Sequence, residues 1–363
     1  MLRMPKKFNR AAVAAALCLC VGTCTLPTAP AQAFDLGTLG TVISMGAQYA
    51  YLDKQLNYID NDGRNDYMTQ IKQKYGVDET EQANAMLGNI MTRLSDSIAT
   101  TDPSITKKPY NYFVNKDTSF NAFCTLGHNL SVNIGLFDKL NYNENEIAFV
   151  IAHELGHGQK GHPVSGVRKS LPIQLVASLY SSQGTAAALG ASLASQIGTA
   201  KLVTKPMEKE ADALAFGYAV GAGYNVGAGA AVWQRVLEKY SSDSNGVSEL
   251  FNDHPTNVSR RDKYSEDITK WSNGIVKVNS DSGMITLRDK DFFKPADMTS
   301  MSGKERAYLI AGNLSAVYHN TKTPTSDVTV SGDNLLYVGE QPIMDMNSEK
   351  DPSAIQSKLK SLL

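Results

Sequence analysis

Apolar residues recur at helical spacing through much of the first third of the chain. Residues 34–100 predict helix, and Asp102-Pro103 ends this region because proline disfavours helical backbone in the residue before it. Short apolar runs then predict strands at Tyr110–Val114 and Leu130–Ile134. The clearest helical repeat lies between Asp78 and Ser97, and its apolar members are Ala83, Ala85, Met86, Ile90, Met91 and Leu94.

A second strong helical pattern begins after Asn143. This residue is a candidate helix cap, and Glu146 follows three residues later as in a capping box. Two further helices are predicted at Glu208–Ala219 and Gly227–Tyr240. The helix after Asn143 ends where glycine and proline recur, at Gly158, Gly161 and Pro163.

The segment Ser170–Ala200 contains no charged residue. Sixteen of its thirty-one residues are Gly, Ala or Ser, so its hydrophobicity falls short of that of a transmembrane helix. The favoured interpretation is a set of small-residue helices packed closely against the core. A lid or a membrane-touching surface is the alternative.

The pattern changes after Trp271, where short alternating runs predict two hairpins. Each hairpin precedes a predicted helix, one capped by Ser302 with Glu305 and one beginning near Pro352. This ββαββα pattern predicts a small α+β domain of unassigned role at residues 272–363. The predicted strands of the hairpins are Ile275–Val278, Met284–Leu287, Val328–Val330 and Leu335–Val338.

Residues 1–33 resemble a secretory signal peptide. Four basic residues precede an apolar stretch, Ala11–Val21, and Ala31-Gln32-Ala33 is a typical cleavage site. The mature chain is therefore expected to begin at Phe34 and to be periplasmic or secreted. Lipid attachment at Cys24 is disfavoured, because the preceding residue, Thr23, is not one of the small residues that lipoprotein signals place there.

Composition and charge narrow the function classes. Apolar residues make up 42% and charged residues 20% of 363 residues, which suits a globular protein with a sizeable core. Removal of the leader takes the net charge from −1 to −5, so no nucleic-acid partner is implied. Cys124 is the single cysteine of the mature chain, and it is interpreted as a small buried apolar residue.

The sequence His153-Glu154-Leu155-Gly156-His157 lies within the helix predicted after Asn143. Residues four apart share a helix face, so both imidazoles can bind one metal ion. Glu154 lies at the edge of that face, where it can contact a water molecule beside the metal without binding the metal itself. This pattern predicts a metal site with an adjacent general base.

A catalytic zinc site needs a third protein ligand and one open position. Glu208 and Asp212 share one face of a predicted helix, so Glu208 can bind the metal while Asp212 accepts the free N–H of a ligand histidine. Glu210 points elsewhere and is expected to be solvated. One zinc ion per chain is therefore expected. Without the histidines, this acidic cluster would be interpreted as a surface helix face.

The chain resembles the zinc metallopeptidase family of the CAAX prenyl protease and HtpX, and is closest to its exported soluble members of the BepA and LoiP type. The order and spacing of the motifs agree from about Glu81 to Lys263. Four elements carry the resemblance: Asn121-Ala122-Phe123, His153 to His157, Glu208 to Asp212, and His254-Pro255 with Arg260.

The resemblance implies a mainly helical α+β fold of the gluzincin type at residues 34–271, with a small edge sheet. It implies Glu208 as third ligand and peptide-bond hydrolysis as the reaction. The strand at Asn121-Ala122-Phe123, continuing to Cys124, is expected to pair with the substrate backbone as an added strand. It also places His254 where it can occupy or guard the fourth metal position, and Arg260 in a supporting place near the site. Either residue is a candidate to stabilise the oxyanion during catalysis.

The expected function is therefore that of an exported zinc-dependent endopeptidase of unfolded or misassembled proteins, with Glu154 as general base. Its expected partners are polypeptides, and contact with the membrane surface or with envelope proteins is left open. No transmembrane helix is expected in the mature chain. The alternative is a chaperone-like binding factor with low turnover, inhibited by His254. A structural zinc module is disfavoured because such sites rarely have an adjacent base.

The other histidines are not expected at the metal. His162 is nine residues beyond His153, about half a turn around a continued helix, so it is expected to face away. His128 lies in a predicted turn, and His319 lies in the C-terminal block.

Overall fold

The computed structural model describes residues 36–170, 190, 203–240, 257–319, 321 and 324–363. The predicted leader, nearly all of Ser170–Ala200 and His254 lie outside the described residues. The chain divides into two compact units, residues 1–47 and Gln48–Leu363, and all described helices and strands except the start of the first helix lie in the second unit.

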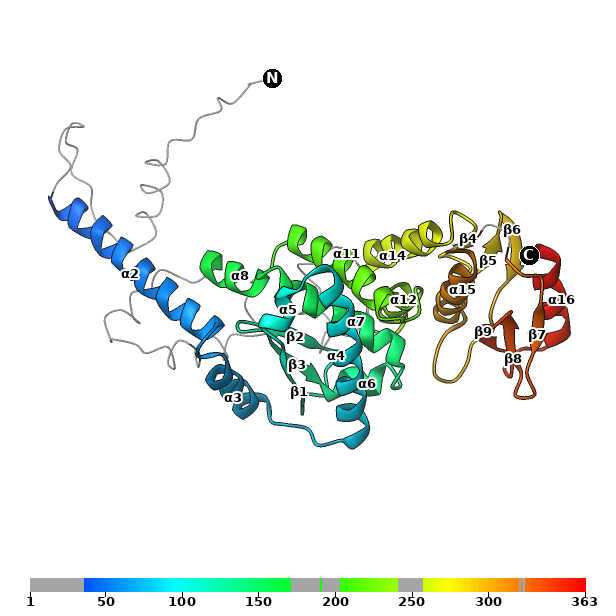
Figure 1. The fold of residues 1–363 in the computed structure, drawn as a ribbon, viewed down its shortest axis with the longest axis horizontal. Helices are drawn as coiled ribbons and strands as arrows, with labels where there is room; N and C mark the ends of the chain where they lie inside the picture. The colour runs from blue at the N-terminus through cyan, green and yellow to red at the C-terminus, as the bar shows by residue number, and fades with distance from the viewer. Residues whose placement is uncertain (1–35, 171–189, 191–202, 241–256, 320, 322–323) are drawn as a thin grey trace, which may run out of the picture. The chain divides into compact units, whose positions relative to one another are not determined.

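Helices make up most of the described part of the chain, and three small sheets accompany them (Figure 1). The predicted helical region before Asp102 contains three helices separated by short breaks. The helices up to Trp271 are α2 (Leu36–Asp60), α3 (Arg64–Tyr75), α4 (Glu81–Thr101), α5 (Ser104–Lys107), α6 (Ile134–Lys139), α7 (Glu144–Gln159), α8 (His162–Ser170), α11 (Lys205–Gly221), α12 (Ala228–Lys239) and α14 (Asn257–Trp271).

The first sheet has the strand order β1-β3-β2, with β1 (Asn111–Asn115), β2 (Ala122–Thr125) and β3 (Asn129–Asn133). β1 runs parallel to β3, and β2 runs antiparallel to it. β2 is therefore an edge strand, and it packs beside α7. The turn between β2 and β3 uses left-handed backbone at Gly127 and His128, with φ of 77° and 53°.

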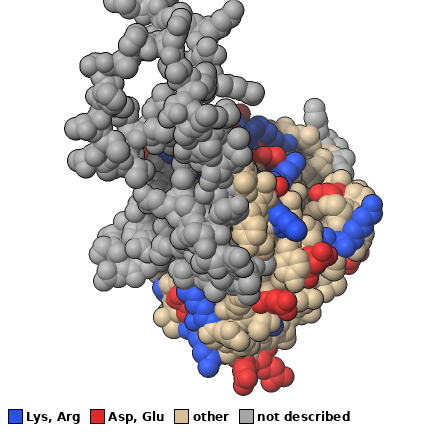
Figure 2. Space-filling view, turned by 90° about the vertical axis from the view of Figure 1, so that its left-hand side faces the viewer, with Lys and Arg blue, Asp and Glu red and all other residues tan. Residues whose placement is uncertain are grey.

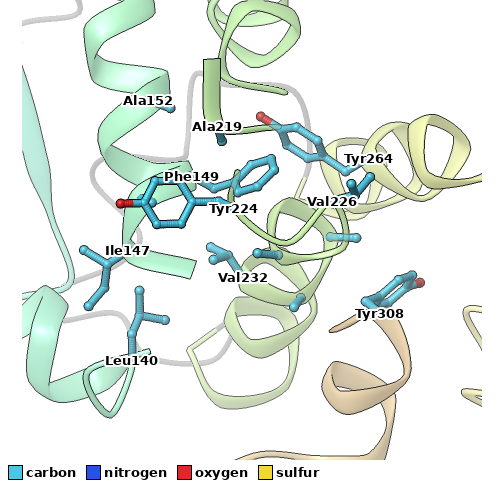
Figure 3. Packing of buried hydrophobic residues seen from close by; sticks show 14 of the residues in the cluster. Leu140, Ile147, Phe149, Ala152, Ala219, Tyr224, Val226, Val232, Tyr264 and Tyr308 are labelled. Carbon is cyan, nitrogen blue, oxygen red and sulfur yellow. The ribbon is translucent and has the colours of Figure 1, made fainter. Parts of the chain in front are cut away.

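Helix α7 is the central helix of the core. The Asn143 side chain caps its start by accepting a hydrogen bond from the Glu146 amide, as predicted. It packs against α11 and α12, and its Phe149 ring meets Tyr264 of α14 edge to face. Figure 3 shows Phe149 among Val232, Tyr264 and neighbouring residues. The helix ends at Gln159, two residues before Gly161, whose φ is +62°.

One glycine determines how closely α7 and α11 pack. A Cβ atom at Gly156 would lie 3.2 Å from the carbonyl oxygen of Ala211 on α11, closer than nearly all real contacts of this kind. A larger residue would force the helices apart, because backbone cannot move aside as a flexible side chain can.

The C-terminal block contains one strand more in each half than the ββαββα pattern predicts. The missed strands, β6 and β9, do not alternate polar and apolar residues, and β9 contains Pro342. Pairing with β5 and β8 defines them. The block consists of β4 (Val276–Val278), β5 (Ile285–Leu287), β6 (Lys290–Phe293), α15 (Gly303–His319), β7 (Val328–Val330), β8 (Leu335–Val338), β9 (Gln341–Asp345) and α16 (Pro352–Leu362).

Helix α15 packs against α12 and α14, so apolar side chains of the block and of the preceding helices form one continuous core cluster. The division of the chain at Trp271 into two domains stays a prediction. None of the described helices combines the length and apolar content that a membrane crossing needs. On the described part of the face in Figure 2, acidic and basic side chains are interspersed.

A buried charge cluster joins three of these helices. Arg235 on α12 donates to Glu146 on α7 and to Glu305 on α15, and all three side chains are fully buried. Burial raises the pKa of Glu146, and the neighbouring Glu305 raises it further. Burial also raises the pKa of Glu305 to about 7, against the opposing effect of Arg235. One buried cation thus stabilises one of the two carboxylates, while the other keeps its proton.

Replacing Glu305 by Gln should change how stability depends on pH. The pKa of Glu305 rises from an ordinary value of 4.5 to about 7 on folding, so the folded state holds this proton more tightly. Its stabilising contribution is complete below pH 4.5 and is lost as the pH rises through 7. We therefore expect the free energy of unfolding of Glu305→Gln, relative to that of wild type, to be higher at about pH 7.5 than at about pH 5, as measured by urea unfolding. A difference between variant and wild type that is the same at both pH values, as expected for the exposed control Glu340→Gln, would contradict this assignment.

Candidate metal centre and active site

Three buried side chains from two helices converge at one point. His153 and His157 lie one turn apart on α7, and Glu208 lies in the first turn of α11. The Nε2 atoms of the two histidines are 3.0 Å apart, and each lies 3.3 Å from one carboxylate oxygen of Glu208. In the described part of the chain these three residues are the one group of His, Cys, Asp or Glu side chains placed to hold a metal ion.

This donor set fits zinc. Two imidazole nitrogens and one carboxylate oxygen are ligands of catalytic zinc sites, and ligand atoms around one tetrahedral zinc lie roughly 3.3 Å apart. The three separations agree with that value. The Glu208 side chain is 1% exposed, and a carboxylate at such depth needs a cation beside it.

The second nitrogen of His153 contacts a buried ion pair. Its Nδ1 lies 3.0 Å from Asp212 Oδ1, while Arg260 donates two hydrogen bonds to the same carboxylate. When Nε2 binds a metal, Nδ1 carries the proton and donates it to Asp212. Arg260 Nη2 also lies 3.1 Å from His153 Nδ1, because both donors converge on one oxygen.

Aromatic side chains complete the surroundings of this ion pair. The Arg260 guanidinium lies 3.7 Å from the centre of the Trp233 ring, and the Tyr264 hydroxyl donates to Asp212 at 3.2 Å. These contacts hold Asp212 and Arg260 in one arrangement away from solvent.

The charges around His153 shift the pKa values of both partners. Burial and the Arg260 charge lower the pKa of His153, but hydrogen bonds to Asp212 and Glu208 outweigh them and raise it to about 9. Burial raises the pKa of Asp212, but Arg260 and His153 outweigh burial and hold it well below its usual range. Asp212 is therefore ionised at any physiological pH, as an acceptor for a metal-binding imidazole must be.

The candidate base, Glu154, faces the edge strand. The backbone amide of Cys124 on β2 donates to Glu154 Oε2 at 2.9 Å. Beside them is a cavity of roughly 520 Å³, counted with its open mouth, to which His153, Glu154 and Ala122 contribute. Its other lining residues are Phe120, Asn121, Phe149, Val150, Gly229, Val232, Trp233, Arg260 and Tyr264.

The three residues predicted to bind substrate do not share one environment. Asn121 and Ala122 line the cavity, whereas Phe123 packs against Tyr75, with ring centres 5.3 Å apart. His254 lies outside the described residues, so its predicted place at the metal is not seen.

The prediction that His162 faces away is wrong. Its Nδ1 lies 2.9 Å from Nδ1 of His157. The prediction assumed that α7 continues, but the helix ends at Gln159, and the turn at Gly161 brings His162 back towards the site as the first residue of α8. The glycine at position 161 was the available signal. Glu210, expected to be solvated, is half exposed and also reaches His162 Nε2, at 3.4 Å.

The site is therefore of the metallopeptidase type. It combines two histidines one helical turn apart, a carboxylate from a second helix, and a glutamate beside an edge strand that is not one of the ligands. The chain belongs to Peptidase family M48, whose sequence profile matches residues 81–267, slightly more than half of the chain.

Two curated relatives are also similar to part of this chain. The putative beta-barrel assembly-enhancing protease of Vibrio cholerae serotype O1 is 26% identical over 235 residues, which cover 62% of this chain and 46% of the relative. The metalloprotease LoiP of Escherichia coli K12 is 29% identical over 192 residues, which cover 51% of this chain and 73% of the relative. The chain thus spans less than half the length of the first of these relatives.

Removing Glu208 or Asp212 should weaken zinc binding to different degrees. Glu208→Ala removes one of three ligands and should lose most of the zinc. Asp212→Ala keeps all three ligands and should lose roughly 10–100-fold in affinity. Elemental analysis and chelator competition on the purified protein measure both effects. Glu79→Ala, on the exposed surface, is the control; full zinc occupancy in Glu208→Ala would rule out this ligand set.

Proposed function

We propose that the chain is an exported zinc-dependent endopeptidase that hydrolyses unfolded or misassembled proteins. The observation that carries the proposal is the convergence of His153, His157 and Glu208, with Glu154 between this cluster and an edge strand. The separate findings on the family and its relatives agree with peptide-bond hydrolysis.

The zinc ion held by His153, His157 and Glu208 would supply a Lewis acid that polarises the scissile carbonyl and lowers the pKa of water to about 7. Glu154 takes a proton from the attacking water and passes it to the leaving amine. Its carboxylate is suited to this role because it lies beside the ligands without being one of them, and the Cys124 amide orients it.

The edge strand β2 is the proposed place for the substrate backbone. The Cys124 amide points to Glu154 and not to β3, and alternate residues of a strand turn their backbone groups to the same edge. Ala122 therefore offers its backbone on the side of Glu154. A polypeptide added beside β2 would gain main-chain hydrogen bonds, which select extended chains with little regard to sequence.

The lining of the cavity beside β2 favours unfolded proteins as the substrate class. Apolar side chains dominate its lining, among them Phe149, Val150, Val232 and Trp233. Such a cavity accepts an apolar side chain next to the scissile bond, and unfolded proteins expose these side chains where folded proteins bury them. Export, and contact with envelope proteins, are proposed from the leader and from the name of the Vibrio cholerae relative.

Arg260 has a positioning role in this mechanism. Two of its nitrogens donate to Asp212, and its guanidinium lies against Trp233, so it acts on the metal site through Asp212 and His153. Stabilisation of the oxyanion would then come from a bound metal and from groups other than Arg260 and Asp212. The gating or assisting role of His254 stays a prediction.

Replacing Glu154 by Gln should separate a peptidase from a binding factor. The amide keeps the shape of the side chain but cannot accept the proton, so zinc content should be unchanged and casein hydrolysis should fall by roughly 10²–10⁴-fold. Wild type, Glu154→Gln and the control Glu79→Ala are compared in the same assay at equal zinc content. Full hydrolysis by Glu154→Gln would contradict the assignment of the base, and full biological function without hydrolysis would favour the chaperone-like alternative.

Export predicts a mature N-terminus at Phe34. Secretion of the full chain and N-terminal sequencing of the exported product test it. A lipid-modified Cys24 at the N-terminus, or an intact leader on exported protein, would contradict this cleavage site.

A further inference from the structure

We propose that His162 is a positioning residue for the metal site, which holds His157 in the orientation and tautomer that zinc binding needs. The inference rests on the zinc site proposed above. His157 would then be supported on its outer nitrogen, as His153 is by Asp212, but by a different kind of group.

The contact is short, buried and directed at the correct atom. The Nδ1 atoms of His157 and His162 are 2.9 Å apart, and the two rings meet nearly edge to face, at 68°. The His162 side chain is only 5% exposed. His157 turns its Nε2 to His153 and Glu208, so His162 contacts the nitrogen that faces away from the metal position.

The hydrogen-bond chemistry allows one consistent arrangement of protons. A metal at His157 Nε2 takes the lone pair there, so the proton of the neutral ring sits on Nδ1 and must be donated. His162 Nδ1 is the acceptor at that distance. The proton of His162 then sits on its Nε2, which faces Glu210 Oε2 at 3.4 Å, and Lys160 lies 3.2 Å from the same carboxylate.

The two ligand histidines therefore have unequal support. Asp212 is a buried carboxylate held by Arg260, whereas His162 is a neutral ring whose own partner, Glu210, is half exposed. Without His162, the Nδ1–H of His157 would be left buried and unsatisfied, which costs free energy only while the ring is held in this position. Loss of the acceptor should therefore weaken metal binding more than it weakens the metal-free fold.

Two variants of similar volume isolate the acceptor. His162→Gln retains an oxygen that can accept from His157, and His162→Leu does not. We expect His162→Leu to lower zinc affinity by roughly 10–100-fold and His162→Gln to restore most of it. Chelator competition measures the affinity, and urea unfolding in excess chelator measures the metal-free fold. His128→Leu, which removes a histidine from the turn between β2 and β3, is the matched control for zinc affinity.

The spectrum of the cobalt-substituted protein distinguishes support from ligation. A positioning role leaves the ligand set intact, so the absorption of the Co²⁺ form of His162→Leu should keep the intensity of wild type at saturating metal. A changed ligand set in that spectrum would mean that His162 binds the metal directly and would overturn the proposal.

Each remaining outcome is also decisive. Wild-type zinc affinity in His162→Leu, or equal losses in the Leu and Gln variants, would overturn the role of the acceptor. A loss of metal-free stability as large as the loss of zinc binding, or failure of both variants to fold, would show that His162 serves the fold and not the site.

Glu208→Ala in the same titration separates the hypothesis of the zinc site from that of the His162 role. If Glu208→Ala binds zinc normally, the zinc site itself is wrong. If it loses zinc while His162→Leu does not, only the role of His162 is wrong.

Discussion

The close packing of α7 on α11 is the constraint on which the site depends. The two histidines come from one helix and the carboxylate from another, so the three ligand atoms meet only if the helix backbones approach closely. Gly156, between the histidines, permits this approach, since its Cα faces the backbone of Ala211. This contact also lies close to the third ligand, because Ala211 follows Glu208 by three residues, almost one helical turn further along α11. Packing at this point therefore sets the distance between His153 or His157 and Glu208.

A cluster of ionisable groups at such depth is costly unless each charge has a partner. Asp212 and Arg260 form one such pair, packed against Trp233, and they bring α14 to the pair of helices that hold the metal ligands. His162 and Glu210 serve the other histidine from the opposite side, with less burial and no full ionic pair. The support of His153 is therefore a buried ion pair, whereas the support of His157 ends at a half-exposed carboxylate.

The sequence predicted the parts of this arrangement that depend on local spacing. The positions of α7, α11 and the hairpins β4-β5 and β7-β8 followed from periodicity and caps, and the metal ligands followed from helical spacing and the family resemblance. Features fixed by tertiary pairing escaped, among them the strands β6 and β9. The place of His162 was mistaken because a single turn at Gly161 reverses the direction in which a helix-based angle points. The contact between Trp233 and Arg260 also escaped, because it joins residues that lie on different helices.

The fully buried cluster of Arg235, Glu146 and Glu305 has a consequence for how this chain can evolve. Glu146 belongs to the helix that carries both histidines, while Glu305 lies beyond the region that the family shares. An exchange of the C-terminal block for an unrelated one would remove one of the two carboxyl groups that Arg235 contacts inside the core. A buried donor of Arg235 would then lose its acceptor, so position 235 should vary together with the block in lineages that lose or replace it.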